Sequence, residues 1–149
     1  MKHFLSFLGF LCIFSVLFIY FVTQNQQIHS VNNNHANHGA VHIPSEYTPP
    51  SVKIHVMEDY SGSWLLKVDT ENFTFSPEKV GLTAPSYNEG HAHLYVNGKK
   101  INRLYGSYYN LGNLKHGKNE IKVSLHSNNH GALMYEGSLI AQQTVVYSE

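Results

Sequence analysis

Two histidines separated by one residue, His91 and His93, are the part of the sequence best suited to chemistry. On an extended strand the side chains at positions i and i+2 leave the same face, so both imidazoles point to one side. Two more histidines, His126 and His130, follow a second alternating stretch, and Met134 comes shortly after them. Three or four imidazoles suit Cu(II) or Zn, and an added thioether favours Cu(I). These five residues are the predicted metal ligands.

The alternation around these histidines predicts which of them can cooperate. In residues 90–97 His91 and His93 alternate with apolar side chains. In residues 121–126 the apolar side chains also occupy every second position, and His126 falls on the opposite face. All three histidines are therefore expected to lie away from the aliphatic face. If the two strands are neighbours, the three imidazoles share one face of a sheet. Imidazole binds metal only when it is neutral, so metal affinity is expected to fall below a pKa of about 6.5. The alternative is that these histidines are polar strand residues that hydrogen-bond to loop backbone.

From Ser51 onward the sequence has the period of two that is typical of strands with one buried face. Asn97-Gly98, the strongest short hairpin signal, joins two of these stretches. No stretch after Pro50 has a convincing helical face. About six to eight short strands in about 100 residues predict a single antiparallel β-sandwich of the cupredoxin or immunoglobulin kind. The expected strands are residues 52–56, 64–68, 73–75, 94–96, 101–105, 121–125 and 143–147.

Residues 1–22 differ in kind from the rest of the chain, because residues 4–22 are almost wholly apolar. Their length falls within the range of about 17–25 residues that crosses a bilayer, so we expect an uncleaved transmembrane helix. Cleavage as a secretory signal, which would release the protein, is the alternative. Lys2 precedes the span and predicts a cytoplasmic N-terminus, with the remainder on the periplasmic or extracellular side.

Residues 23–50 are rich in amides and histidines, poor in apolar residues and closed by Pro49-Pro50, which predicts a flexible linker. Residues 51–149 are then the sandwich domain. The histidines of the linker could capture copper, zinc or nickel weakly, or they could reflect nothing more than biased composition. They are His29, His35, His38 and His42.

Composition excludes several classes of protein. The exported part has no cysteine, since the single one is Cys12, so it can form neither a disulfide framework nor the thiolate-ligated blue-copper site. The formal net charge is zero and no basic patch indicates nucleic-acid binding. Carboxylates such as Glu58 and Asp59 have no nucleophile or paired-carboxylate arrangement beside them, so we do not expect an enzyme.

The segment Gly90-His91-Ala92-His93-Leu94-Tyr95-Val96 resembles a motif of small exported bacterial proteins, mostly uncharacterised, that are built on a cupredoxin-like sandwich. The resemblance also includes residues 71–78, the Arg103-Leu104-Tyr105-Gly106 segment and residues 125–130, and it covers approximately residues 62–146. It implies copper binding. Leu66 and Asn110 depart from the pattern, because relatives often carry histidine at these two positions.

The expected function is therefore a membrane-tethered, extracytoplasmic β-sandwich that buffers or delivers a metal ion. Copper is the favoured ion and zinc the alternative, and delivery would require a protein partner for metal transfer. A sandwich used for adhesion or partner docking, with structural histidines and no metal, is the other hypothesis.

Overall fold

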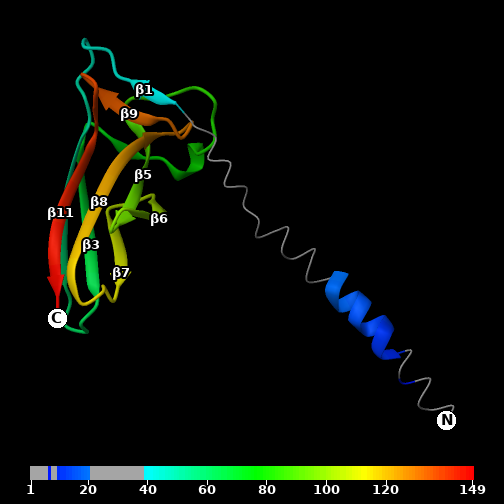
Figure 1. Cartoon of the computed structure of the whole chain (residues 1–149). Coiled ribbons are helices and arrows are strands. Elements are labelled where there is room, and N and C mark those ends of the chain that lie inside the picture. Colours follow the sequence, from blue (N-terminus) through cyan, green and yellow to red (C-terminus); the bar gives the residue numbers. More distant parts are fainter. Residues whose placement is uncertain (1–6, 8–9, 21–38) are drawn as a thin grey trace. The chain divides into compact units, whose positions relative to one another are not determined.

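The computed structural model describes residue 7, residues 10–20 and residues 39–149 (Figure 1). The chain divides into two compact units, Met1–Asn37 and His38–Glu149. In the first unit residue 7 and residues 10–20 are helical. Among the described residues, no helix is long and apolar enough to cross a membrane. The transmembrane segment expected over residues 4–22 extends at both ends into residues outside the described part, and membrane anchoring stays a prediction.

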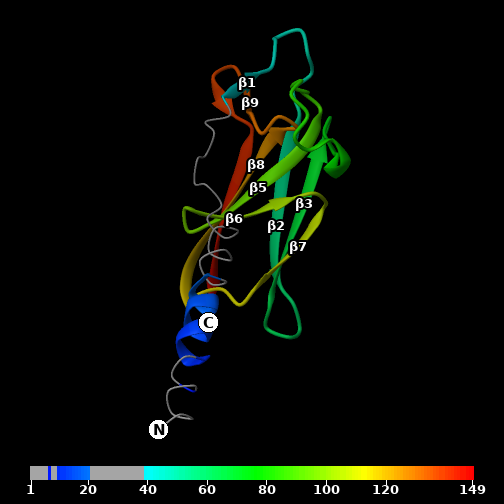
Figure 2. The same cartoon turned by 90° about the vertical axis from the view of Figure 1, so that its right-hand side faces the viewer.

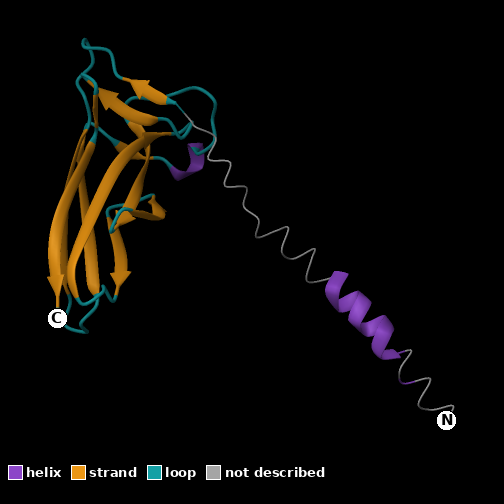
Figure 3. Cartoon of the chain, viewed as in Figure 1, coloured by secondary structure: helices purple, strands orange, loops and turns teal. Residues whose placement is uncertain are grey.

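The second unit is a β-sandwich of two sheets, coloured orange in Figure 3. The smaller sheet has the order β2 (Ser51–Glu58), β3 (Trp64–Glu71) and β7 (Tyr108–Gly112). In the larger sheet β5 (Glu89–Val96) pairs with β8 (Gly117–Ser127) at the centre. Figure 2 shows the sheet of β2, β3 and β7 facing the sheet that holds β5 and β8. The other elements are β1 (Ala40–His42), β4 (Thr74–Phe75), a short 3-10 helix (Pro77–Lys79), β6 (Lys99–Leu104), β9 (Ala132–Tyr135), β10 (Ser138–Leu139) and β11 (Ala141–Ser148).

The core lies between the two sheets and is filled by alternate residues of their strands. Leu94 of β5 and Val123 of β8 pair in register, and both are fully buried. Leu66 and Val68 of β3 bury their side chains from the opposite sheet. The period of two in the sequence therefore has its expected cause, which is one apolar face per strand.

The larger sheet is mixed rather than purely antiparallel, which corrects part of the predicted fold. β4 pairs with β5 in parallel, and β1 pairs with β9 in parallel. Both parallel strands are very short. Neither β1 nor β4 is joined to its partner strand by a hairpin turn. A longer connection crosses over before the partner strand begins, which allows the two strands to run in parallel.

β1 lies within the segment expected to be a linker. Val41 and Ile43 are buried in the core, and they alternate with the exposed His42. The folded unit therefore includes residues 39–50 and begins before residue 51, where the sequence predicts that the sandwich starts. A strand of three residues among polar neighbours is too short for its alternation to stand out.

Candidate functional site

Three of the predicted ligands lie together on the outer face of the larger sheet. His91 of β5 is paired with His126 of β8, and His93 is paired with Ser124. The ring centroids of His93 and His126 are 3.6 Å apart, and those of His91 and His93 are 4.9 Å apart. All three imidazoles are buried, with at most 7% of the residue exposed. The strand parity read from the sequence thus predicts the shared face correctly.

The close pairing of β5 and β8 at this point depends on Gly90. A Cβ at residue 90 would overlap the backbone carbonyl oxygen of His126. Only glycine allows the two backbones to approach in this way, and that approach sets the distance between the histidines of the two strands.

The turn after β8 carries His130 toward the same place. His130 has a left-handed backbone with φ of 67°, which is uncommon for a residue other than glycine. Its amide donates to the carbonyl of Ser127, and the Ser127 amide donates to the carbonyl of Gly131. The His130 ring centroid lies 5.0 Å from that of His91. Four imidazoles from three segments thus form one group, the histidine cluster.

The hydrogen bonds of His126 fix its tautomer. Nδ1 of His126 donates to the carbonyl oxygen of His130 at 3.3 Å, which leaves Nε2 with its lone pair. That Nε2 accepts from the hydroxyl of Ser124 at 3.0 Å. A histidine that binds metal commonly donates its second nitrogen to a backbone carbonyl in this manner. His126 therefore has the tautomer that can bind a metal through Nε2, and the hydroxyl of Ser124 occupies the position that a metal ion would take.

The nitrogens of His91 and His93 are less well satisfied. Their Nε2 atoms lie 3.0 Å apart, and Nζ of Lys100 lies 3.1 Å from the same Nε2 of His93. One lone pair on that nitrogen cannot accept fully from both neighbours. Nδ1 of His91 is buried and has no hydrogen-bond partner. An unsatisfied buried polar atom costs about 1–3 kcal/mol, which argues that the site has a purpose beyond stability.

The strand histidines are held neutral. Burial, followed by the positive potential of the neighbouring histidines, lowers the pKa of His91 to about 3. Burial lowers the pKa of His93 to about 2 and that of His126 to about 4. A metal ion needs neutral imidazole, so competition from protons should begin well below the pKa of about 6.5 expected from the sequence.

Two cations that sequence reasoning did not assign to the site lie beside the histidine cluster. Both lie on β6, a strand that pairs with β5. Arg103 is paired with His93, and Lys100 is paired with Tyr95. Burial and the nearby Arg103 lower the pKa of Lys100. The guanidinium of Arg103 also disfavours protonation of His91, His93 and His126. The cluster is thus flanked by fixed positive charge.

Met134 is farther along the same face. It lies on β9 in register with His42 of β1, and the only pairing of β9 with β8 joins Ala132 to His126. Met134 and His42 therefore follow the histidine cluster toward the edge of the sheet. The other linker histidines, His29, His35 and His38, lie outside the described residues.

The described residues contain no group of three or more His, Cys, Asp or Glu side chains already arranged to hold a metal ion. The hydrogen bonds supply the physical reason. Nε2 of His126 faces Ser124 and Nε2 of His93 faces Lys100, so the nitrogens do not all point to one centre. Closing a coordination shell would require these two side chains to release the imidazoles.

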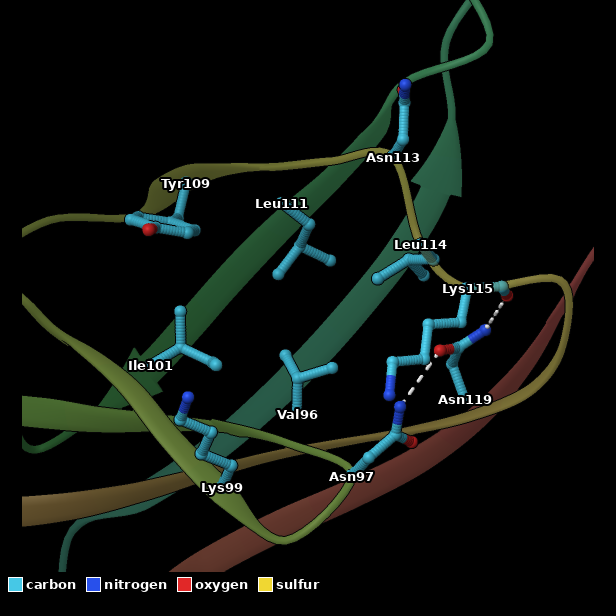
Figure 4. Close-up of a pocket in the computed structure, with 10 residues that line it drawn as sticks. All are labelled: Val96, Asn97, Lys99, Ile101, Tyr109, Leu111, Asn113, Leu114, Lys115 and Asn119. Carbon is cyan, nitrogen blue, oxygen red and sulfur yellow. Dashed lines mark hydrogen bonds between the residues drawn. The ribbon is translucent and has the colours of Figure 1, made fainter.

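A separate cavity of about 530 Å³ lies where the β5–β6 turn faces β7 and the segment that follows it (Figure 4). Its floor is apolar, and the amide of Asn97 donates to Asn119 beneath it at 3.0 Å. No histidine, carboxylate or nucleophile lines this cavity, so it offers no comparable chemistry. The apolar residues of the floor are Val96, Ile101, Tyr109, Leu111 and Leu114, and Lys99 and Lys115 are its cations.

Comparisons with known proteins give no match: no protein-family model, no curated protein and no solved structure is similar to this chain.

Proposed function

We propose that this protein is a metal-binding β-sandwich module that buffers or delivers a metal ion, with His91, His93, His126 and His130 as ligands. The observation that carries the proposal is the gathering of four imidazoles on the outer face of a sheet, away from the core, with two Nε2 atoms 3.0 Å apart. These side chains contribute nothing to the apolar core, and one of them leaves a buried nitrogen unsatisfied.

Copper is the favoured ion. Two nitrogens that each lie about 2.0 Å from one ion are about 2.8 Å apart at a square angle and about 3.3 Å apart at a tetrahedral angle. The separation of 3.0 Å between His91 and His93 is compatible with either, so zinc remains the alternative. Imidazole ligands without thiolate suit Cu(II), whereas Cu(I) would favour an added thioether, for which Met134 lies farther along the same face.

Attachment to a membrane through residues 4–22 belongs to the same proposal. It rests on the apolar N-terminal sequence, with the sandwich on the periplasmic or extracellular side. A tethered domain that holds metal on the outer face of a sheet, without a redox-tuning thiolate, suits buffering and transfer to a protein partner better than electron transfer.

Metal titration of the folded unit tests the proposal. In the described part of the chain, every residue of the core lies at Val41 or later, so residues 38–149 are the fragment to use. We expect the fragment to bind at least one equivalent of Cu(II) or Zn, and H91A/H93A to lose that equivalent while keeping its β-sheet circular dichroism. H55Q is the matched control, because His55 lies on the other sheet beside Asp69. Unchanged stoichiometry in H91A/H93A would reject these ligands.

A docking or adhesion sandwich with structural histidines is the second candidate. The hydrogen bonds of His126 to Ser124 and to the backbone of His130 favour it, because they hold the β8–β9 turn without any ion. Under this reading the fragment binds neither metal, and H126A loses stability instead of metal affinity. The same titration therefore separates the two functions.

A further inference from the structure

The charge around the histidine cluster is one-sided. Nζ of Lys100 lies 3.1 Å from Nε2 of His93, and Arg103 is paired with His93 on the neighbouring strand. In the part of the chain that the structure describes, neither cation forms an ion pair with a carboxylate. The ion pairs of that part are Lys53–Glu71, His55–Asp69, Lys67–Asp69 and Lys79–Glu89.

This imbalance matters for a metal ion. Neutral imidazoles bring no negative charge, so a divalent ion bound among them would lie next to two fixed cations with nothing to offset the repulsion. Among the residues described, Ser124, Tyr95 and Tyr105 also lie beside the histidine rings, and none of them is a carboxylate. The compensating charge must therefore come from outside the described part of the chain.

We propose that the histidine cluster binds its metal ion together with a small oxyanion, such as bicarbonate or a short carboxylate, held by Lys100 and Arg103. The inference rests on the proposed metal-binding function. An oxyanion would accept from the ammonium of Lys100 and from the forked guanidinium of Arg103. Drawing Lys100 away from His93 also frees Nε2 of His93 for the metal, so the two ligands assist each other through one side chain.

Metal and anion must then bind with reciprocal coupling, because each raises the affinity for the other by the same factor. We expect bicarbonate or acetate to tighten Zn binding to residues 38–149 by about tenfold, relative to perchlorate at matched free-ion concentration. K100Q/R103Q should bind Zn in perchlorate more tightly than the unaltered fragment, since the repulsion is gone, and should show no anion effect. Both side chains lie outside the core, so the fold should survive.

K99Q provides the matched control. Lys99 is the next residue and carries the same charge, but it lines the separate cavity of Figure 4 and should leave the anion effect intact. If Zn binds with the same affinity in perchlorate and bicarbonate, the anion inference is overturned and the metal site stands. If Zn binds under neither condition, both proposals are overturned. An anion effect that K99Q abolishes as fully as K100Q/R103Q would also overturn the assignment to these two residues.

Discussion

The inner and outer faces of β5 and β8 are made by the same two strands but are buried in different ways. On the inner face, Leu94 and Val123 are covered by the second sheet and contribute transfer free energy to the fold. On the outer face, neither sheet of the described residues lies above His91, His93 and His126, and the imidazole rings stack on one another. Burial on the inner face stabilises the protein, whereas burial on the outer face desolvates polar groups at a cost.

The largest effect should separate these two faces. L94A removes a fully buried side chain from the inner face and should lower the free energy of unfolding by about 2–5 kcal/mol. The protein that remains folded should still bind metal with the original affinity. H93A, one residue away, should change stability by less than about 1 kcal/mol, because two groups compete for its nitrogen, yet it should abolish tight metal binding.

Urea denaturation and Zn titration of both variants make this measurement. The distinction between the faces fails if H93A destabilises as much as L94A, because the histidine would then be a core residue in energetic terms.

The next effect concerns the contact that holds the faces in register. G90A places a methyl group against the carbonyl oxygen of His126, so β5 and β8 must separate locally. We expect a loss of about 1–3 kcal/mol in stability, as for overpacking, together with a weaker metal site. G106A is the control, since a Cβ at Gly106 meets nothing within 4 Å. Equal behaviour of the two variants in denaturation and titration would contradict the role given to Gly90.

Much of the inner face can be predicted from the sequence, because alternation over five or more residues is unambiguous. Alternation does not identify the buried residues of β3 and β11. The run Leu65-Leu66 does not reveal which of its two residues faces the core, and in the structure Leu66 is fully buried whereas Leu65 is only partly buried. Val145-Val146 presents the same ambiguity, and Val146 packs on the core while Val145 is 40% exposed. Adjacent apolar residues leave the choice of face to tertiary packing.

The outer face is predicted for its histidines but not for its cations. The Asn97-Gly98 turn pairs Val96 with Lys99 and Tyr95 with Lys100, and a regular ladder would continue by placing Asn102 opposite His93. A bulge between Leu94 and Tyr95 shifts the register by one residue and places Arg103 there instead. The sequence pattern does not reveal a bulge of this kind, so the position of Arg103 beside His93 could not be predicted and is known only from the structure.

The pH dependence of stability should sharpen the comparison, because only the outer face titrates in the acid range. In the unfolded chain each imidazole binds a proton near pH 6.5, whereas in the fold the pKa values of His91, His93 and His126 are about 3, 2 and 4. Between these values the unfolded state binds more protons, so stability is fully present above about pH 6.5 and falls as the pH drops.

Each histidine contributes at most about 1.4 kcal/mol per pH unit in that window. Denaturation of the metal-free fragment between neutral pH and pH 4.5 should therefore show a slope that H93Q reduces by about one third. H116Q, which removes an exposed histidine, is the matched control for the substitution. A slope that H93Q leaves unchanged would show that His93 is protonated in the fold as readily as in the unfolded chain.

The smallest effect on stability, at His130, separates backbone strain from ligand chemistry. A left-handed conformation costs an alanine about 1 kcal/mol more than glycine, and asparagine tolerates it better than most residues. H130G and H130N should therefore be as stable as the unaltered fragment or slightly more stable, while H130A should be less stable than either. All three should lose metal affinity to the same extent, because all three lack the imidazole. If the loss of affinity instead follows stability, with H130N retaining full binding, the turn only shapes the site and the three strand histidines are the ligands.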